Sequence, residues 1–300
     1  MYRRDCGDGR KPEKTRNAQH FETRKFINMK ILFIGDIFGR SGREALERHL
    51  PMLKSKYAPD VVIVNGDNAA NGRGITPKQA NEFYEWGVDC ITGGDHIWDQ
   101  RQIISHIDKD PKLLRPINFP DNTPGKGAYK FQTKSGQICL IIHALGRVFI
   151  DPSDNAFTIV KDMVDKNPLG KRADAIFVDF HAEATSEKMA MGQFLDGKVS
   201  AVIGSHTHVQ TADAHIMRDG TAYMTDAGMT GDYNSVIGAR TDIAIHRFLH
   251  KTPHPERLIP ANGEATLCGA LITTNDGTGL AQKIETIRVG GILPECLPQS

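Results

Sequence analysis

The sequence predicts an α/β protein built on a mostly parallel sheet, and two observations predict it. Between residues 30 and 107, patterns of buried strands alternate with patterns of amphipathic helices, which is the order of parallel strands joined by helical crossovers. Each of the three predicted strands ends in the same dipeptide: Gly35-Asp36, Gly66-Asp67 and Gly94-Asp95. Functional groups gather at the carboxyl ends of such strands, so these aspartates are candidates for a site.

The first half of the chain supplies the clearest elements. Short apolar runs predict strands over 30–36, 60–67 and 88–95. The helix predicted over 43–57 places Leu46, Leu50 and Leu53 on one stripe. A second helix over 76–86 begins at Thr76-Pro77, a favourable cap and first helical residue, and a short third helix is expected over 99–107.

The second half repeats the pattern less regularly. We expect a hairpin over 129–133 and 137–144, a helix over 157–165, a strand over 173–181, a capped helix over 186–195 and a strand over 199–208. In the C-terminal part of the chain the sequence predicts strands over 221–226, 267–274 and 283–289, with a hairpin turn at Asp276-Gly277.

Composition excludes several classes of protein. Of 300 residues, 39% are hydrophobic and 24% charged, and the formal net charge of +1 gives no overall field that would draw the chain to nucleic acid or a membrane. The five cysteines show no CxxC spacing, which favours a reducing cytoplasm over a disulfide scaffold. Residues 1–28 are polar and aperiodic, so we expect a disordered extension before one domain over 29–300.

Two histidines follow the strand predicted over 199–208. His206 and His208 stand two positions apart, and on an extended segment such residues point to the same side. Two imidazoles that converge on one point suit a transition metal. A pair of ordinary loop histidines would look the same, so this stretch alone leaves both interpretations open.

The other strand ends favour the metal. A single Asp at a strand end is more often a helix cap or a turn residue. Here five strand ends carry side chains that ligate metals: Asp36; Asp67 with Asn68; Asp95 with His96; His181; and His206 with His208. Carboxylates gathered at one rim repel one another unless a cation lies among them. The mixed oxygen and nitrogen donors suit Mn, Fe or Zn, and their number suits two ions, as in centres for phosphoryl transfer.

These blocks resemble the five motifs of the calcineurin-like metallophosphoesterases, and longer stretches resemble the YmdB branch of that superfamily. The longer stretches are residues 34–43, 65–72, 179–188 and 204–213, and the likeness runs from Met29 to about Gly290. The resemblance implies a four-layer α-β-β-α sandwich, with two mixed sheets flanked by helices. It also implies a metal-dependent hydrolase of 2′,3′-cyclic nucleotides or related small phosphodiesters, acting by attack of a hydroxide that bridges two metal ions.

The same resemblance implies individual roles. Six side chains would hold the two ions: Asp36 and His208 the first, Asp95, His181 and His206 the second, and Asp67 both. Asn68 would lie at the first ion and contact the phosphate, while His96 would contact the phosphate and protonate the leaving oxygen. We expect Fe or Mn in this centre, with Zn as an alternative, and Glu183 as a possible partner of a ligand histidine.

Two positions depart from the family pattern. The YmdB branch usually has Glu where Asp67 stands, so the bridging carboxylate here reaches one methylene less. The superfamily usually has Asn where Asp95 stands, and the extra negative charge should tighten the binding of hard cations and lower their Lewis acidity. These differences affect metal identity and rate rather than the existence of a site.

Other functions stay open at this point. The same centre could serve a phosphomonoesterase or a ribonuclease, or the chain could be a regulatory binding protein with a vestigial site. A broad nuclease would need a basic groove with aromatic side chains, and 7% aromatic residues with a net charge of +1 weigh against one. We therefore expect a small phosphodiester or cyclic nucleotide as partner, RNA only as a substrate, no membrane, and a homo-oligomer.

Overall fold

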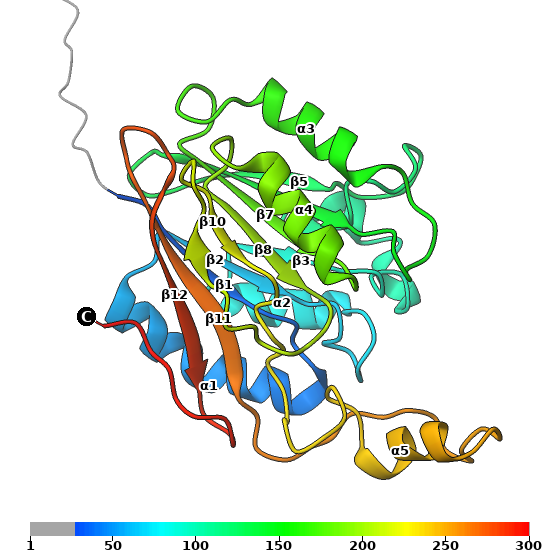
Figure 1. Ribbon diagram of the computed structural model, residues 1–300. Helices are drawn as coiled ribbons and strands as arrows, with labels where there is room; N and C mark the ends of the chain where they lie inside the picture. The colour runs from blue at the N-terminus through cyan, green and yellow to red at the C-terminus, as the bar shows by residue number, and fades with distance from the viewer. Residues whose placement is uncertain (1–27, 300) are drawn as a thin grey trace, which may run out of the picture.

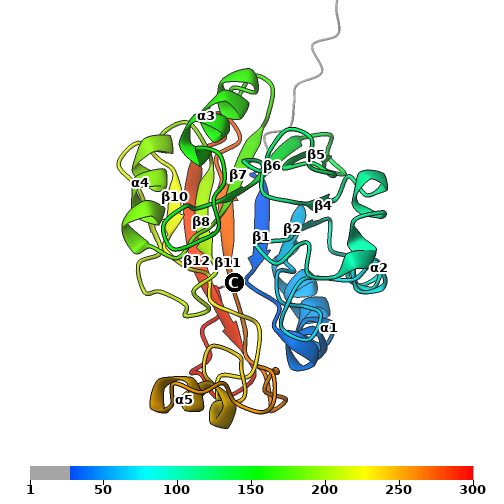
Figure 2. The ribbon, with the colours of Figure 1, turned by 90° about the vertical axis from the view of Figure 1, so that its right-hand side faces the viewer.

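The molecule is a sandwich of four layers. The structure, a computed structural model, describes residues 28–299, so the expectation for residues 1–28 falls outside it except for Asn28. Two six-stranded sheets pack face to face, and helices cover both outer faces (Figures 1 and 2). This is the four-layer α-β-β-α sandwich that the family resemblance implied. Within the described residues, no helix is long and apolar enough to cross a membrane.

The first sheet has the strand order β12-β11-β1-β2-β3-β4. Its strands are β1 (Lys30–Ile34), β2 (Val61–Asn65), β3 (Cys90–Thr92), β4 (Leu113–Leu114), β11 (Leu267–Thr274) and β12 (Ala281–Val289). Strands β1 to β4 are parallel, and the β11–β12 hairpin joins them antiparallel to β1. Helices α1 (Gly39–Tyr57) and α2 (Pro77–Glu85) are the crossovers that cover its outer face.

The second sheet has the order β5-β6-β7-β8-β10-β9. Its strands are β5 (Ala128–Gln132), β6 (Ile138–Leu145), β7 (Ala175–His181), β8 (Ala201–Ser205), β9 (His215–Ile216) and β10 (Ala222–Met224). The predicted β5–β6 hairpin is confirmed, and β6, β7, β8 and β10 run parallel. Helices α3 (Ala156–Lys166) and α4 (Thr185–Leu195) cover the outer face (Figure 2).

The alternation of side chains along the strands builds three separate apolar cores. In β1, Ile31 and Phe33 point into the space between the sheets, while Leu32 and Ile34 point toward α1. The Phe33 ring meets Phe177 of the other sheet at a centroid distance of 5.1 Å. Both faces of each central strand are buried, which is why these strands read as continuous apolar runs.

Three expectations about local structure need correction. Residues 99–107 form two short 3₁₀ turns, η1 (Arg101–Ile103) and η2 (Ile107–Lys109), instead of one helix. Ile103 in η1 and Ile107 in η2 are both buried. A helix this short is not stable by itself, so the burial of these two side chains decides the local structure. Helix α1 begins at Gly39, before the start predicted at residue 43. Helix α4 has Ala184 at its N-cap, which offers no side-chain acceptor.

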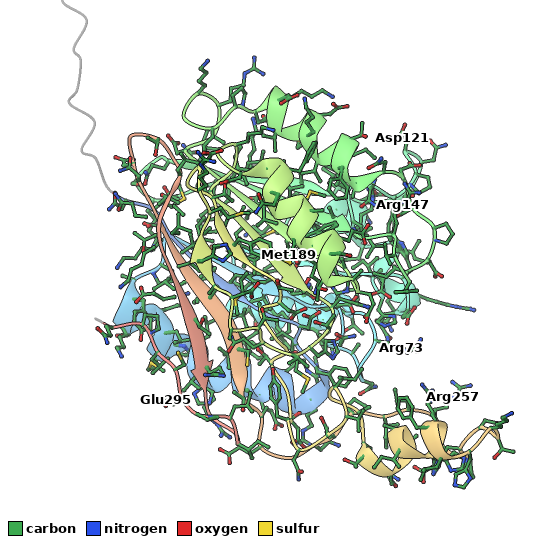
Figure 3. The ribbon with its side chains drawn as sticks, in the orientation of Figure 1. Arg73, Asp121, Arg147, Met189, Arg257 and Glu295 are labelled. Carbon is green, nitrogen blue, oxygen red and sulfur yellow. The ribbon has the colours of Figure 1, made fainter. Side chains whose placement is uncertain are left out.

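One helix was not predicted from the sequence. Helix α5 (Thr241–Leu249) belongs to a stretch of residues 240–259, here called the α5 excursion, which leaves the sandwich and returns to it. In Figure 3, Arg257 lies in this excursion, outside the body of the molecule. The excursion closes at its base through Arg240 N, which donates to the Ile259 carbonyl at 2.9 Å.

Candidate metal centre

All the predicted site residues gather where the two sheets present the carboxyl ends of their strands. β1, β2 and β3 lead into Asp36, Asp67 with Asn68, and Asp95 with His96, while β7 and β8 lead to His181 and to His206 with His208. The tight turns explain the repeated glycine. Gly94 has a φ of +59°, and a Cβ there would lie 2.0 Å from Asp67 Oδ1. Only glycine lets the β3 turn approach the Asp67 carboxylate this closely.

Asp95, His181 and His206 form one compact group. His181 Nε2 lies 3.0 Å from Asp95 Oδ1 and 3.1 Å from His206 Nδ1, and His206 Nδ1 lies 3.4 Å from Asp95 Oδ1. Burial alone would raise the pKa of Asp95, but the hydrogen bonds from the two imidazoles outweigh it and hold this pKa below its usual range. Burial lowers the pKa of His181 to about 4, so its imidazole is neutral and suited to bind a metal.

Asp36 and Asp67 approach the two different nitrogens of the His181 ring. The distance from His181 Nδ1 to Asp36 Oδ1 and the distance from His181 Nε2 to Asp67 Oδ2 are both 3.7 Å. Burial, with the nearby charges of Asp226 and Asp179, raises the pKa of Asp36 to about 8. Burial, with Asp95 and Asp36, raises the pKa of Asp67.

The residues at this edge fit a pair of metal ions. Asp36 Oδ1 is buried without a hydrogen-bond partner, and several carboxylates that disfavour one another's charge surround it. In the described part of the chain, three sets of ligand atoms lie within 4.8 Å of one another: Asp95, His181 and His206; Asp36, Asp67 and His181; and Asp67, Asp95 and His96. A cation among them would remove the repulsion and satisfy the orphaned oxygen.

His208 lies beside Asn68, apart from His206. Its Nε2 is 3.0 Å from Asn68 Oδ1, and its Nδ1 is 2.8 Å from the Ile237 carbonyl. The expectation that the two histidines share one side of an extended segment was wrong: β8 ends at Ser205, and His206 and His208 have φ of +96° and +66°. Left-handed backbone turns the two rings toward different parts of the cluster, and such strain is typical of functional sites.

His96 lies at the opening of the cluster. Its backbone N–H donates to Asp67 Oδ1 at 2.8 Å, and its Nδ1 lies 3.1 Å from Asp99 Oδ2. The carboxylate of Asp99 therefore fixes the orientation of the ring. Glu183 Oε2 lies 3.3 Å from Nε2 of His206, one of the candidate ligand histidines.

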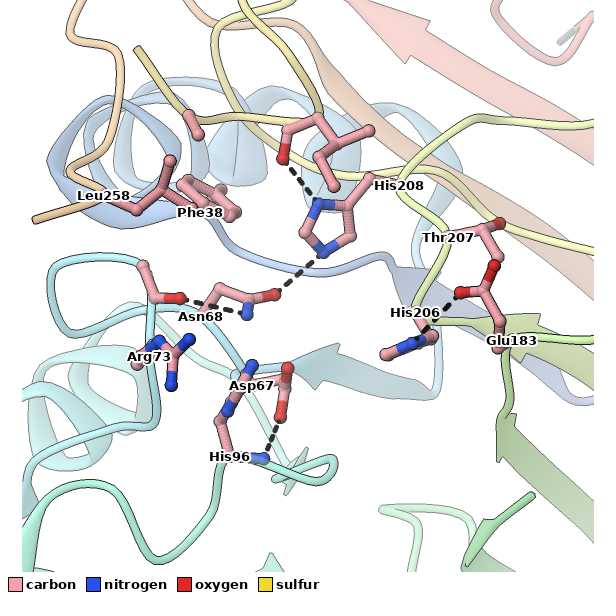
Figure 4. Close-up of a pocket in the computed structure, with 13 residues that line it drawn as sticks. Phe38, Asp67, Asn68, Arg73, His96, Glu183, His206, Thr207, His208 and Leu258 are labelled. Carbon is pink, nitrogen blue, oxygen red and sulfur yellow. Dashed lines mark hydrogen bonds and ion pairs between the residues drawn. The ribbon is translucent and has the colours of Figure 1, made fainter. Parts of the chain in front are cut away.

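A pocket of about 300 Å³ opens over these residues. Figure 4 shows Asp67, Asn68 and His96 on one side of His208, with His206 and Glu183 further along the wall. Arg73 also lines the pocket, and the sequence interpretation missed it. The sequence signal that could have drawn attention to Arg73 is the turn around it, formed by Asn71, Gly72 and Gly74. All three residues adopt positive φ in the structure.

A buried polar network under the cluster was also missed. Asp179 accepts hydrogen bonds from Asn65 Nδ2 at 3.0 Å and from the Ser205 hydroxyl at 2.6 Å, and Asn65 Oδ1 accepts one from Asp67 N at 2.9 Å. The fully buried His143 lies with its Nδ1 3.2 Å from Asp179, and its Nε2 accepts from the N–H of Gly94 at 2.9 Å. The network ties the strand ends of both sheets together.

A buried ion pair holds the loop between the two site histidines. Lys188 on α4 donates to Asp226 at 2.6 Å, and both side chains are almost fully buried. The same carboxylate oxygen accepts from the backbone N–H of Thr207 at 3.0 Å and from its hydroxyl at 2.7 Å. The sequence interpretation assigned Lys188 only to the start of a helix, because nothing local shows that it is buried.

The two-sheet sandwich, with an Asp/His cluster at the carboxyl ends of its strands, defines a hydrolase of the metallophosphoesterase type. Comparison with known proteins identifies the family. A family model described as "YmdB-like protein" matches residues 32–287, and the chain belongs to this family.

Individual relatives agree with this assignment. The chain is 46% identical to a Bacillus subtilis protein named 2′,3′-cyclic-nucleotide 2′-phosphodiesterase, over 87% of this chain and 97% of the relative. A crystal structure from Thermus thermophilus, titled a hypothetical protein, matches with a TM-score of 0.81 at 38% identity, covering 88% of this chain and 100% of that one. A Mycoplasma pneumoniae structure titled a novel phosphatase also has a TM-score of 0.81, at 34% identity over 88% and 94%.

Proposed function

We propose that this hydrolase opens the cyclic phosphodiester of 2′,3′-cyclic nucleotides. The observation that carries the proposal is one pocket in which Asp67, His206 and His208 of the Asp/His cluster meet two side chains suited to contact a phosphate, Asn68 and His96. The Bacillus relative, whose name states this activity, aligns over nearly its whole length. A five-membered cyclic phosphate is strained, which lowers the demand on the leaving group.

The metal ions would be held by seven side chains: Asp36, Asn68 and His208 at one position, Asp95, His181 and His206 at the other, and Asp67 between them. The mixed oxygen and nitrogen donors suit Fe, Mn or Zn, and the family resemblance favours Fe or Mn. When bound, such ions supply Lewis acidity and lower the pKa of bound water.

Two side chains would contact the phosphate and the leaving oxygen directly. Asn68 Nδ2 donates to the Gly72 carbonyl at 3.2 Å, so its second N–H would be offered to a nonbridging phosphate oxygen. Its Oδ1 lies 3.0 Å from His208 Nε2, beside the other side chain of the first metal position. Because Asp99 holds His96 by Nδ1, the Nε2 of His96 is left to contact the phosphate and to donate a proton to the departing alkoxide. General acid catalysis of this kind typically contributes about 10²–10⁴-fold to a rate.

Turnover of 2′,3′-cyclic AMP by protein loaded with Mn²⁺ tests the proposal. We expect His96→Ala to lower kcat by roughly 10²–10⁴-fold. Asp67→Asn should lower both the metal content and the rate, because it removes the charge between the two metal positions. His215→Ala is the matched control, since His215 is an exposed histidine on β9 outside the pocket.

Undiminished turnover in His96→Ala and Asp67→Asn would contradict the assignment of the site. A phosphomonoester such as p-nitrophenyl phosphate belongs in the same assay. Faster hydrolysis of the monoester than of the cyclic diester would contradict the proposed substrate. Elemental analysis of the purified protein tests the expectation of Fe or Mn.

We further propose that the chain forms a homo-oligomer through the α5 excursion. Ile245, Phe248 and Leu249 on α5 are 43%, 85% and 71% exposed, which is unusual for apolar side chains grouped on one short helix. Light scattering should report a mass above that of one chain, and Phe248→Glu should lower it. A monomeric wild-type protein would contradict the proposal.

The cytoplasm is the compartment that we propose. Cys90, Cys139 and Cys268 are buried free thiols, as is typical of proteins in a reducing environment. Fractionation of cells that produce the protein would test this.

A further inference from the structure

The pocket has a second wall that the proposed chemistry does not use. Its polar wall carries the Asp/His cluster with Asn68 and His96, whereas the other wall consists of Phe38, Ile237, Ala239 and Leu258, here called the apolar wall. Figure 4 shows Phe38 and Leu258 together on one side of His208, while Glu183 lies on the other. A phosphate with its metal ions needs only the polar wall, so the apolar wall is available to another part of a ligand.

Ile237 is the most unusual residue of this wall. It is a β-branched residue with a φ of +47°, a conformation in which such side chains are strained. Its carbonyl oxygen lies 2.8 Å from His208 Nδ1. This contact explains why the backbone adopts this conformation, but it does not explain why the residue is an isoleucine. A glycine could hold the same carbonyl without strain. The isoleucine side chain is instead 57% exposed and lines the pocket.

Leu258 faces the same pocket from the segment of the α5 excursion that leads back to the sandwich. Ala239 and Pro260 pair at the base of the excursion, and Ala261 N donates to the Gly238 carbonyl at 2.8 Å. Ile237 and Leu258 therefore lie on the two paired segments that form this base. Neither belongs to the three buried cores, so packing of the sandwich does not explain them.

Phe38 and Ala239 form the fixed back of the wall. Phe38 is 7% exposed, and its ring meets His208 edge-on at a centroid distance of 5.3 Å. A Cβ at Gly238 would lie 2.6 Å from this ring, so glycine packs directly on it. The back of the wall is rigid, and the side chains of Ile237 and Leu258 are the parts that a ligand can cover.

We propose that the apolar wall is a nucleobase subsite, in which Ile237 and Leu258 cover a face of the base of the bound cyclic nucleotide. This inference rests on the proposed function. In a 2′,3′-cyclic nucleotide the phosphate is fused to the ribose, so the base lies one sugar away from the phosphorus. A pocket of about 300 Å³ with one polar and one apolar wall suits a ligand with a charged end and a flat apolar end.

The experiment compares two substrates that share the same reacting group. One is 2′,3′-cyclic AMP, and the other is glycerol 1,2-cyclic phosphate, which has the five-membered cyclic phosphate but no base. For Ile237→Gly and for Leu258→Ala, we expect the ratio of kcat/KM between nucleotide and glycerol substrates to fall roughly 10-fold. The loss should lie in KM for the nucleotide, because the base contacts are the same in the ground and transition states.

The controls separate this inference from the proposed function. Ile292→Ala changes an isoleucine that is 62% exposed and outside the pocket, and it should leave the ratio unchanged. Equal losses on both substrates in the two wall variants, or no loss on either, would overturn the nucleobase subsite while the proposed function stands. If the Mn²⁺-loaded wild type hydrolysed neither cyclic phosphate, the proposed function and the subsite would both be overturned.

Discussion

Replacing Lys188 by methionine should destabilise the protein far more than replacing a surface lysine. Lys188 is 1% exposed, and its Nζ lies 2.6 Å from Asp226, which is fully buried. Lys188→Met keeps the length and the apolar stem of the side chain but leaves the Asp226 carboxylate buried without its cation. Removal of one partner from a buried ion pair costs about 3–5 kcal/mol of unfolding free energy.

The same change should weaken the metal centre. The Asp226 carboxylate also accepts the two hydrogen bonds from Thr207, which stands between His206 and His208. If this carboxylate moves toward water once its cation is lost, the loop that carries both imidazoles loses its anchor. We therefore expect a lower metal affinity in addition to the loss of stability.

Urea denaturation of the metal-free protein measures the first effect, and titration with Mn²⁺ measures the second. The matched control is Lys161→Met, since the Lys161–Asp165 pair is exposed by 45% and 53% and should contribute less than about 1 kcal/mol. In the background of Lys188→Met, Asp226→Asn should restore part of the stability by removing the unpaired charge. A loss below about 1 kcal/mol in Lys188→Met would refute the reasoning.

Three further predictions concern the site. The pKa of Asp36 is raised to about 8, so folding of the metal-free chain takes up a proton between about pH 4 and pH 8, and stability falls as pH rises through that window. The lowered pKa of His181 opposes this only below about pH 6.5, so Tm measured with a chelator should fall from pH 6.5 to 8 and stay flatter in Asp36→Asn. Gly94→Ala should cost at least about 1–3 kcal/mol by urea denaturation and lower the metal content, because the new Cβ would strike Asp67; unchanged stability would contradict the close approach. His143→Phe should leave the Gly94 N–H without its acceptor, costing about 1–3 kcal/mol and lowering kcat, and a wild-type pH profile and rate would argue against this role.

The side chains that suit metal ligands at the ends of five strands could be found in the sequence, because a strand end is marked by residues that are adjacent in the chain. An apolar run followed by Gly-Asp or by histidine marks where a strand stops, and parallel strands bring such ends to one edge. The order of strands and helices followed from the same periodicities, and the hairpins from their turns. Segments without a clear period, namely residues 99–107 and the α5 excursion, were predicted wrongly or not at all.

What the sequence pattern determined by itself was therefore the alternation of strands and helices, the strand ends and the residue types of the centre, whereas the two-sheet sandwich was implied by the family resemblance. Only the tertiary structure decided how they meet. Asn65 and Asp179 are 114 positions apart, yet their hydrogen bond joins the two sheets under the site. Burial of Lys188, the role of His143 and the left-handed turns at His206, His208 and Ile237 likewise follow from packing between distant segments. Periodicity and turn chemistry act over a few residues, whereas desolvation, charge pairing and backbone strain are set by whatever the fold brings into contact.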